Sequence, residues 1–381
     1  MDILYLNGKP KERITSMKKK SMLIIVLILT FVVSIFMFNK NHELVDKESL
    51  AVFIDDVKTD SFPSKGTVTF LKADCDNNAT IEWDKDSWGL FASNLTKKTK
   101  CNLYFKNLES INDKLNDLVK SDTTNIASDD PDGNIRYIGA SPSNYVYFNC
   151  SDYDNQTSDT CEIWRIIGLF KNINKEDGTK EDLVKIIKDD SIGSVAWDTN
   201  NSNIWANASL KSSFNSGIYY NKTLKNDATR NMIESVVWKL GSTTSFIGDS
   251  EGNPSSLYSA ERNSSNSNNW TGKIALMYPS DYGYAVGGSD RETCLSKSLY
   301  NWSSMPKCYN NNYLYKANIY QWTLMTNNLT GSYVYAVKSN GGFNYGNAYS
   351  TDDARPSLFL KSGIIINNGD GSRTNPYQLS F

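Results

Sequence analysis

The pattern of apolar and polar positions divides the chain sharply near its N-terminal end. Residues 21–38 form an apolar run without charge, Gly or Pro, and this run directly follows three lysines at 18–20. As a helix the run would extend roughly 27 Å, close to the thickness of the hydrocarbon core of a bilayer. Because basic residues dominate before the run, the positive-inside rule predicts a cytoplasmic tail at 1–20, a transmembrane anchor at 21–38 and an extracellular remainder.

A cleaved signal peptide is the main alternative for this run, and a buried core helix is the next. Signal cleavage requires small residues after the apolar core, whereas this run ends in Ile35, Phe36, Met37 and Phe38. A core helix is disfavoured because no face of the segment is polar. We therefore expect a single-pass protein of the cell membrane that contacts the bilayer through 21–38.

The positions after the apolar run predict a short stalk and then a small β module. Residues 39–62 are mixed and charged without a clear period, so we expect a stalk there, with a short strand at 50–54. Alternating and β-branched segments predict an all-β module over 63–108. Trp83 and Trp88 are expected in the core of this module.

A helix and a polar linker are expected between this module and the rest of the chain. Leucine and isoleucine recur at spacings of three and four from Leu108 to Leu118, which predicts an amphipathic helix. A polar, turn-rich stretch follows. We therefore assign 109–133 to a helix and linker and 134–381 to a second domain.

Two further segments of the second domain carry definite expectations. Residues 227–240 place apolar side chains in one helical stripe after Asp227, which predicts a helix with Asp227 as its N-cap. Residues 242–271 are rich in Ser, Asn and Gly, so we expect a long surface loop. Arg355, which precedes Pro356, is expected to be a buried structural arginine.

The six cysteines all lie after the apolar run. An even number of cysteines in an exported region suggests disulfides, although sequence alone does not choose among the connectivities. A zinc site is disfavoured, because the chain has no C-x-x-C motif and a single histidine. The clustering of the cysteines along the sequence favours the three sequence-local pairs Cys75–Cys101, Cys150–Cys161 and Cys294–Cys308.

The histidine and charge content exclude several functional classes. The single histidine is His42, in the expected stalk, so Ser-His-Asp and Cys-His catalysis lacks a base in a folded domain. No constellation singles out two of the many carboxylates. We therefore expect no enzymatic activity, no cofactor and no metal. The net charge of −2 gives no electrostatic reason to expect nucleic acid as a partner.

A series of short motifs follows in order over roughly residues 136–362. They are W-R-I-I-G at 164–168, W-A-N-A-S-L at 205–210 with F-N at 214–215, I-A-L-M at 274–277 with P-S-D-Y at 279–282, W-T-L-M at 322–325, the hairpin at 333–345 and A-R-P-S-L-F-L at 354–360. Their order resembles a domain family of unknown function in Gram-positive surface proteins, built on a C-type-lectin-like scaffold. The resemblance implies an α+β fold for this domain, after the all-β module and the N-terminal transmembrane helix. The W-L-R-S-P motif of that family has lost its Arg and Pro here, and the calcium-binding triplets of sugar-binding C-type lectins are absent.

The candidate ligand-binding residues lie on that hairpin, where Asn340 and Gly341 supply the turn. Aromatic rings combined with amides suit contact with a sugar or a peptide, because rigid rings give contact area at little entropic cost. The alternative is that half of the rings face the core, as the period of two in a strand predicts. The candidates are Tyr333, Tyr335, Phe343, Asn344, Tyr345, Asn347 and Tyr349.

These patterns together favour a membrane-anchored extracellular protein that acts in recognition or adhesion without catalysis. Its expected partners are the membrane and a carbohydrate or a protein on cell surfaces. A structural role in the cell envelope without a dedicated ligand is the alternative, and a surface enzyme is the third.

Overall fold

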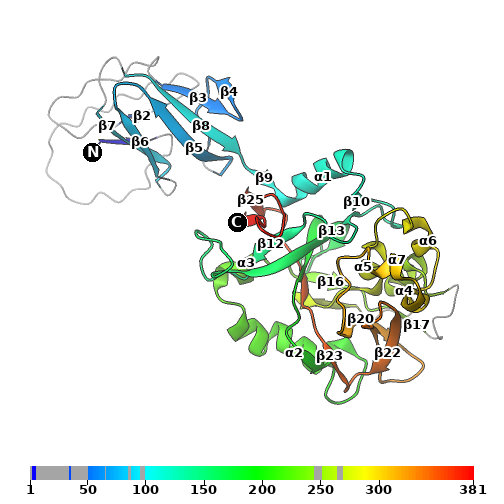
Figure 1. Cartoon of the computed structure of the whole chain (residues 1–381). Helices are drawn as coiled ribbons and strands as arrows, with labels where there is room; N and C mark the ends of the chain where they lie inside the picture. The colour runs from blue at the N-terminus through cyan, green and yellow to red at the C-terminus, as the bar shows by residue number, and fades with distance from the viewer. Residues whose placement is uncertain are drawn as a thin grey trace. The chain divides into compact units, whose positions relative to one another are not determined.

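The computed structural model describes residues 2–5, 34–35, 50–64, 66–84, 87–94, 99–243, 251–263 and 269–381. The chain divides into two compact units, Met1–Leu108 and Glu109–Phe381 (Figure 1). Strands make up 37% of the structure and helices 20%, and the strands form several sheets. The protein is therefore mostly β, and the expected α+β class is wrong.

The expectation of a transmembrane helix also requires correction. Most of 1–20 and 21–38 lies outside the described residues. The described parts, Asp2–Tyr5 and Ser34–Ile35, are strands β1 and β2, which pair with each other, and β1 pairs with β7 (Gly89–Ser93). Within the described ranges no helix is long and apolar enough to cross a membrane, against the expected single-pass protein with a cytoplasmic N-terminus. Ile, Val and Phe, which fill the apolar run, favour strands as well, so hydropathy alone does not fix a helix.

The first unit contains two sheets around an aromatic core. One sheet has the order β4-β3-β8-β5 and the other β2-β1-β7-β6. Leu90, Leu103 and Phe105 are fully buried there, together with Trp88 and the partly buried Trp83. The strands not yet given are β3 (Leu50–Ile54), β4 (Val57–Thr59), β5 (Val68–Cys75), β6 (Thr80–Asp84) and β8 (Cys101–Asn107).

The expected stalk at 39–62 is wrong for its described part. Strand β3 pairs in parallel with β8, and β4 pairs with β3, so both belong to the sheet of the first unit. Val52 of β3 is buried in the core. The short strand expected at 50–54 is confirmed, because its β-branched and aromatic residues favour a strand and burial of Val52 stabilises its place in the sheet.

The second unit begins with the amphipathic helix that the sequence predicts. Helix α1 (Ile111–Ser121) is capped by Ser110, whose side chain accepts a hydrogen bond from the backbone N–H of Asp113. Ile111 and Leu115 are buried in the core of the second unit, so the helix is part of this unit and not of a linker. The expected linker also contains β10 (Ile126–Ala127), which pairs with β11 (Ile135–Tyr137).

The largest sheet of the second unit has the order β10-β11-β13-β14-β24-β19, with β12 also paired to β13. Its centre is the long hairpin of β13 (Glu162–Asn174) and β14 (Lys180–Lys188). Trp164, Ile166 and Ile186 of this hairpin are completely buried. The other strands are β12 (Tyr145–Phe148), β19 (Ile274–Ala275) and β24 (Ser357–Phe359).

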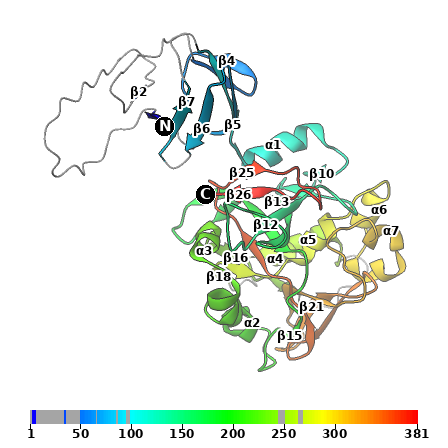
Figure 2. The same cartoon turned by 60° about the vertical axis from the view of Figure 1, so that its left-hand side comes forward.

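A second sheet has the order β15-β23-β20-β21-β22, with β17 paired in parallel to β20. A small sheet of β9, β25 and β26 joins the start of the unit to its last strands (Figure 2). These strands are β9 (Glu109–Ser110), β15 (Ser194–Ala196), β17 (Ser242–Thr243), β20 (Gln321–Asn327), β21 (Tyr333–Val337), β22 (Phe343–Asn347), β23 (Thr351–Asp353), β25 (Ile365–Asn368) and β26 (Gln378–Ser380).

The helices of the second unit are short, and α4 to α7 gather on one side of it (Figure 1). The helix expected over 227–240 ends at Met232, and β16 (Val236–Trp238) then pairs with β18 (Trp270–Gly272). The expected loop over 242–271 contains α4. The short helices are α2 (Ser209–Asn215), α3 (Asp227–Met232), α4 (Pro254–Arg262), α5 (Pro279–Tyr284), α6 (Arg291–Leu295), α7 (Pro306–Tyr309), the 3-10 helices Trp205–Asn207 and Leu299–Ser304, and the π-helix Tyr219–Thr223.

The six cysteines form three disulfides, Cys75–Cys101, Cys150–Cys161 and Cys294–Cys308, which are the sequence-local pairs. Cys75 and Cys101 lie opposite each other on β5 and β8. Disulfides persist in oxidising compartments. The three bonds are therefore consistent with an extracellular protein.

Candidate functional site

All candidate ligand-binding residues except Tyr349 lie on β21 and β22, and the rings of Tyr333, Tyr345, Tyr335 and Phe343 form one row. The two strands place Tyr333 opposite Asn347, Tyr335 opposite Tyr345, and Val337 opposite Phe343. Directly opposite residues share a face of the sheet. Tyr333 stacks on Tyr345 with ring centroids 4.6 Å apart, Tyr345 meets Tyr335 edge to face at 5.9 Å, and Tyr335 stacks on Phe343 at 4.9 Å.

One half of the row belongs to the core. Tyr335 and Phe343 are each 1% exposed. The hydroxyl of Tyr335 accepts a hydrogen bond from Asn327 Nδ2 at 2.7 Å and also bonds Thr243 Oγ1 at 2.7 Å. Burial raises the pKa of Tyr335. These two rings are inaccessible to a ligand in this structure, and they support the outer pair.

The other half of the row is partly open to solvent. Tyr333, Tyr345 and Asn347 are half-buried, and Tyr349 just beyond β22 is 56% exposed. Asn344 is also half-buried, but it lies opposite Ala336 and therefore on the other face of the sheet, away from the row. The ring stack therefore ends at the surface beside the carboxamide group of Asn347.

Two neighbouring loops extend this open end. The side-chain amide of Asn203 donates to the carbonyls of Asn327, Thr330 and Tyr333, which holds the loop around 199–204 against the turn between β20 and β21. The backbone N–H of Tyr349 in turn donates to Asn201 Oδ1 at 3.3 Å.

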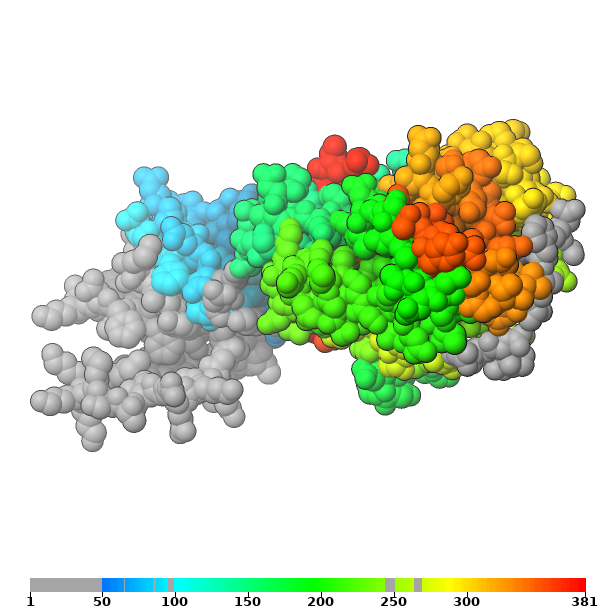
Figure 3. Space-filling view, turned by 90° about the horizontal axis from the view of Figure 1, so that it is seen from below, coloured from blue at the N-terminus to red at the C-terminus, as the bar shows by residue number. Residues whose placement is uncertain are grey.

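Each of these loops exposes a large apolar side chain. Ile204 is 48% exposed and Leu329 is 51% exposed. Figure 3 shows the dark orange segment near residue 345 lying against the green segment near residue 200. We call this surface the tyrosine patch, and its members are Ile204, Leu329, Tyr333, Tyr345, Asn347 and Tyr349.

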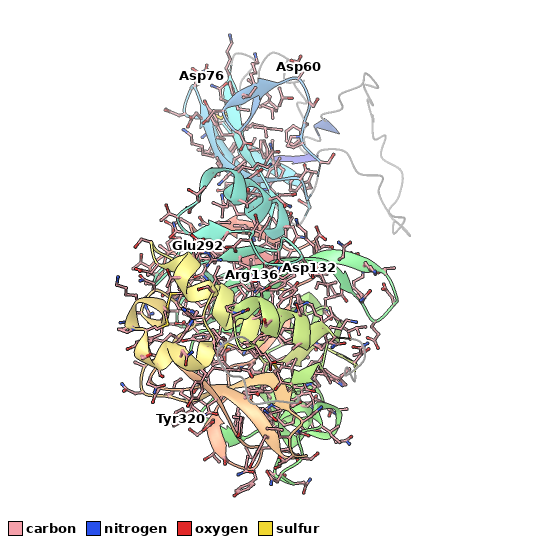
Figure 4. The ribbon with its side chains drawn as sticks, turned by 90° about the vertical axis from the view of Figure 1, so that its right-hand side faces the viewer. Asp60, Asp76, Asp132, Arg136, Glu292 and Tyr320 are labelled. Carbon is pink, nitrogen blue, oxygen red and sulfur yellow. A yellow bond between two sulfur atoms is a disulfide. The ribbon has the colours of Figure 1, made fainter. Side chains whose placement is uncertain are left out.

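A second feature of the unit is a buried network of charges centred on Asp281. Arg136 Nη1 donates to Asp281 Oδ1 at 3.0 Å, and Lys185 Nζ donates to Asp281 Oδ2 at 2.5 Å. Arg136 Nε also donates to Asp130 Oδ2 at 2.6 Å. These four side chains are at most 2% exposed. In Figure 4 Arg136 is labelled in the upper part of the second unit, and Tyr320 is labelled near the lower edge of this unit.

The sheet register brings the two cations of this network together. Arg136 on β11 and Lys185 on β14 both lie opposite Gly168 of β13, one from each side. A Cβ at Gly168 would lie 2.1 Å from the carbonyl oxygen of Ile135 on β11, so only glycine permits this approach of the strands. Asp281 stands in the first turn of α5, where its Oδ2 also accepts the backbone N–H of Tyr278.

Burial and charge shift the pKa values in opposite directions. Burial alone would raise the pKa of Asp281, but Lys185 and Arg136 together hold it below its ordinary value. Burial lowers the pKa of Lys185, and the attraction of Asp281 offsets only part of this effect. Burial would likewise raise the pKa of Asp130, and the charge of Arg136 reverses the shift. We expect both carboxyl groups to be ionised next to a lysine that burial disfavours as a cation.

Helix α4 contributes a third carboxyl group beside this network. Ser280 donates to Glu261 through its backbone N–H at 2.8 Å and through its hydroxyl at 2.5 Å. Arg262 Nη1 donates to Glu261 Oε2 at 3.0 Å. Burial raises the pKa of Glu261 to about 7. Glu261 is not a candidate on sequence alone, because the composition of 242–271 predicts a loop. Asn253 followed by Pro254 is nevertheless a recognisable start of a helix.

A shallow cleft of about 180 Å³ lies between β13, β16 and α4. Phe170, Trp238, Tyr278 and Phe359 line it, and Lys171, Lys239 and Arg262 lie among its polar lining groups. The four rings are nearly fully buried, so they form the wall of the cleft and expose little surface within it. Within the described ranges, no group of three His, Cys, Asp or Glu residues is arranged to hold a metal ion.

The prediction that Arg355 is a buried structural arginine is confirmed. Its side chain is buried, its Nε donates to the carbonyl of Lys188 at 2.8 Å, and its Nη1 donates to the carbonyl of Leu314 at 3.1 Å and to Gln321 Oε1 at 2.9 Å. Trp164, which begins the W-R-I-I-G motif, is buried completely. Arg355 and Trp164 therefore stabilise the core of the second unit.

The chain gives no match to a protein-family model, to a curated protein or to a solved structure. The resemblance to the lectin-like family therefore stays a prediction.

Proposed function

We propose that this protein recognises carbohydrate outside the cell through the tyrosine patch, without catalysis. The observation that carries the proposal is the stacked pair of Tyr333 and Tyr345, which ends at the surface beside Asn347. Buried Tyr335 meets Tyr345 edge to face and itself stacks on Phe343, so the pair is supported by the core before any ligand binds.

The physical basis is the match between a rigid ring and a sugar. The apolar face of a pyranose can stack on a tyrosine ring, and a carboxamide can both donate to and accept from sugar hydroxyls. Fixed rings lose little conformational entropy on binding. Exposed Ile204, Leu329 and Tyr349 extend the contact surface beyond the pair. The three disulfides are consistent with action outside the cell.

The test is a screen of the full chain, with intact disulfides, on an array of glycans and cell-wall fragments, followed by titration calorimetry on each positive ligand. We expect saturable binding that weakens at least about tenfold in Tyr333→Ala and in Tyr345→Ala, because central aromatic residues contribute about 2 kcal/mol or more to such surfaces.

The matched control is Tyr104→Ala in the first unit. Tyr104 is also half-buried on a strand, where it stacks on Phe53 with ring centroids 5.0 Å apart. This variant should bind like the parent protein. Binding that persists in both patch variants would contradict the proposed site. The absence of any glycan ligand for the folded protein would contradict carbohydrate recognition and favour a protein partner or a structural role in the envelope.

A further inference from the structure

Lys185 and Asp281 are a buried lysine and carboxylate in direct contact. They are 96 residues apart in the sequence, and the fold places Lys185 Nζ 2.5 Å from Asp281 Oδ2. Both side chains are 0% exposed. Within the described part of the chain, the ion pairs include no other Lys–carboxylate contact in which both side chains are fully buried.

Other lysine ion pairs of the unit differ in their access to water. Lys316 Nζ lies 2.8 Å from Asp189 Oδ1, but the side chain of Lys316 is 27% exposed. Lys175 lies 2.8 Å from Glu181, whose side chain is 37% exposed. Water can therefore solvate those charges, whereas it is excluded from Lys185 and Asp281.

Aromatic rings enclose the lysine. The ring centroids of Tyr278, Trp238, Phe359 and Phe170 lie 4.4, 5.2, 5.5 and 5.6 Å from Lys185 Nζ. A buried ion pair is costly in such surroundings, because the desolvation of each charge amounts to several kcal/mol. The positive charges of Arg136 and Arg262 further disfavour the protonated form of Lys185. The ring faces attract the ammonium group, but burial and the two arginines still lower the pKa of Lys185. The balance of these effects favours a reaction that removes both charges.

The contact geometry also suits attack of the lysine nitrogen on the carboxyl carbon. A carboxyl C–O bond is about 1.2 Å long, so Nζ lies within about 3.7 Å of Asp281 Cγ. Effective molarities in such fixed arrangements reach very high values, and a near-attack distance is about 3–3.5 Å. Arg136 Nη1 donates to the other oxygen, Oδ1, where negative charge would develop in a tetrahedral intermediate.

We propose that Lys185 and Asp281 form an intramolecular isopeptide bond that links the centre of the largest sheet to the first turn of α5. The ammonium group passes one proton to Oδ2, and the lone pair of the neutral amine forms the N–C bond at Cγ. The C–Oδ2 bond then breaks, and this oxygen leaves as water with a second proton from the nitrogen. The reaction converts one ammonium and one carboxylate into one secondary amide and one water, and it requires no oxidant or cofactor.

The charges of the network remain balanced after the reaction, whereas the backbone N–H of Tyr278 loses Oδ2 as its acceptor. Asp281 loses its charge, but Arg136 keeps the carboxylate of Asp130, to which its Nε donates at 2.6 Å. The amide oxygen that derives from Oδ1 still accepts the hydrogen bond from Arg136 Nη1. The second carboxylate beside Arg136 is what allows the cross-link to form without leaving a buried cation unpaired.

The test is the mass of the intact full chain after denaturation and complete reduction. The expected mass is lower than that of the unmodified sequence by one water molecule. Proteolysis should then yield a branched peptide in which a β14 segment is joined through Lys185 to the α5 segment that contains Asp281. A matched Lys185→Arg variant keeps the positive charge, cannot form the amide under these conditions, and should show the full mass.

Two outcomes would overturn the proposal. One is a parent protein with the full, unmodified mass. The other is loss of water with only linear peptides, because Asp132–Gly133 and Asp370–Gly371 can also lose water by forming a succinimide on the backbone. Since the decisive measurement uses the parent protein, a variant that fails to fold does not affect it.

Discussion

Gly168→Ala is the sharpest perturbation of the strand packing that positions Arg136 and Lys185. The added methyl group would lie 2.1 Å from the carbonyl oxygen of Ile135 and 3.0 Å from Cα of Arg136, and both are backbone atoms. A carbon–oxygen contact requires about 3.3 Å, so β11 would have to move about 1 Å away from β13. Such a movement carries Arg136 away from its two carboxylates.

The magnitude follows from these two effects. Overpacking of a core costs about 1–3 kcal/mol, and disruption of a buried ion pair costs about 3–5 kcal/mol when it is complete. We expect Gly168→Ala to lower the free energy of unfolding of the second unit by about 3 kcal/mol or more. The matched control is Gly346→Ala on β22, where the nearest atom to the added Cβ is Trp322 Cη2 at an ordinary 3.8 Å. This change should alter stability by less than about 1 kcal/mol.

The assay is equilibrium unfolding in urea with intact disulfides, followed by tryptophan fluorescence and circular dichroism. The two units provide an internal reference if their transitions separate, because neither substitution touches the first unit. If Gly168→Ala and Gly346→Ala unfold within about 1 kcal/mol of each other, the close approach of β11 and β13 is refuted as the reason for glycine at 168.

Two further predictions concern the buried charges. Asp130→Ala removes the carboxylate that Arg136 Nε binds, so we expect a loss of about 3–5 kcal/mol in the free energy of unfolding. The same urea titration measures this loss. A loss below about 1 kcal/mol would contradict the pairing of a buried cation with Asp130. Burial raises the pKa of Glu261 to about 7 from an ordinary 4.5, so the folded state binds the carboxyl proton more tightly than the unfolded state does. The stability that this proton contributes is therefore complete below pH 4.5 and is lost as the pH rises through about 7. This loss of stability amounts to about 3 kcal/mol. The Glu261→Gln variant should therefore gain stability relative to the parent protein between pH 5 and pH 8. If the free energies of unfolding of the two proteins depend on pH in the same way, Glu261 titrates normally.

Local patterns predicted the features whose partners lie close in sequence. The apolar spacing before Leu118 gave α1, and Asn340 with Gly341 gave the β21–β22 hairpin. The predicted helix over 227–240 failed in its second half, because Val236 and Val237 satisfy a helical stripe and a strand equally well. Pairing with β18 then decided for the strand.

The charge network could not be predicted from local patterns. Arg136 and Asp281 are separated by 145 residues, and nothing near either residue indicates the other. Glu261 lies in a segment whose composition suggested a loop, and its environment depends on the packing of α4 against Ser280. The sequence predicted that aromatic residues gather on the hairpin. The division of the row into a buried and an open half depends on Asn327 and Thr243, which approach Tyr335 from other strands.

The small sheet of β9, β25 and β26 determines how the second unit would respond to a mechanical load. β25 is antiparallel to both neighbours, so β9 at the entry of the unit and β26 at its exit run in the same direction on either side of it. Tension between entry and exit would therefore pull these two strands in opposite directions along their axes. The hydrogen bonds to β25 would be loaded together in shear and would not open one after another, so this sheet would resist tension between the two ends of the unit.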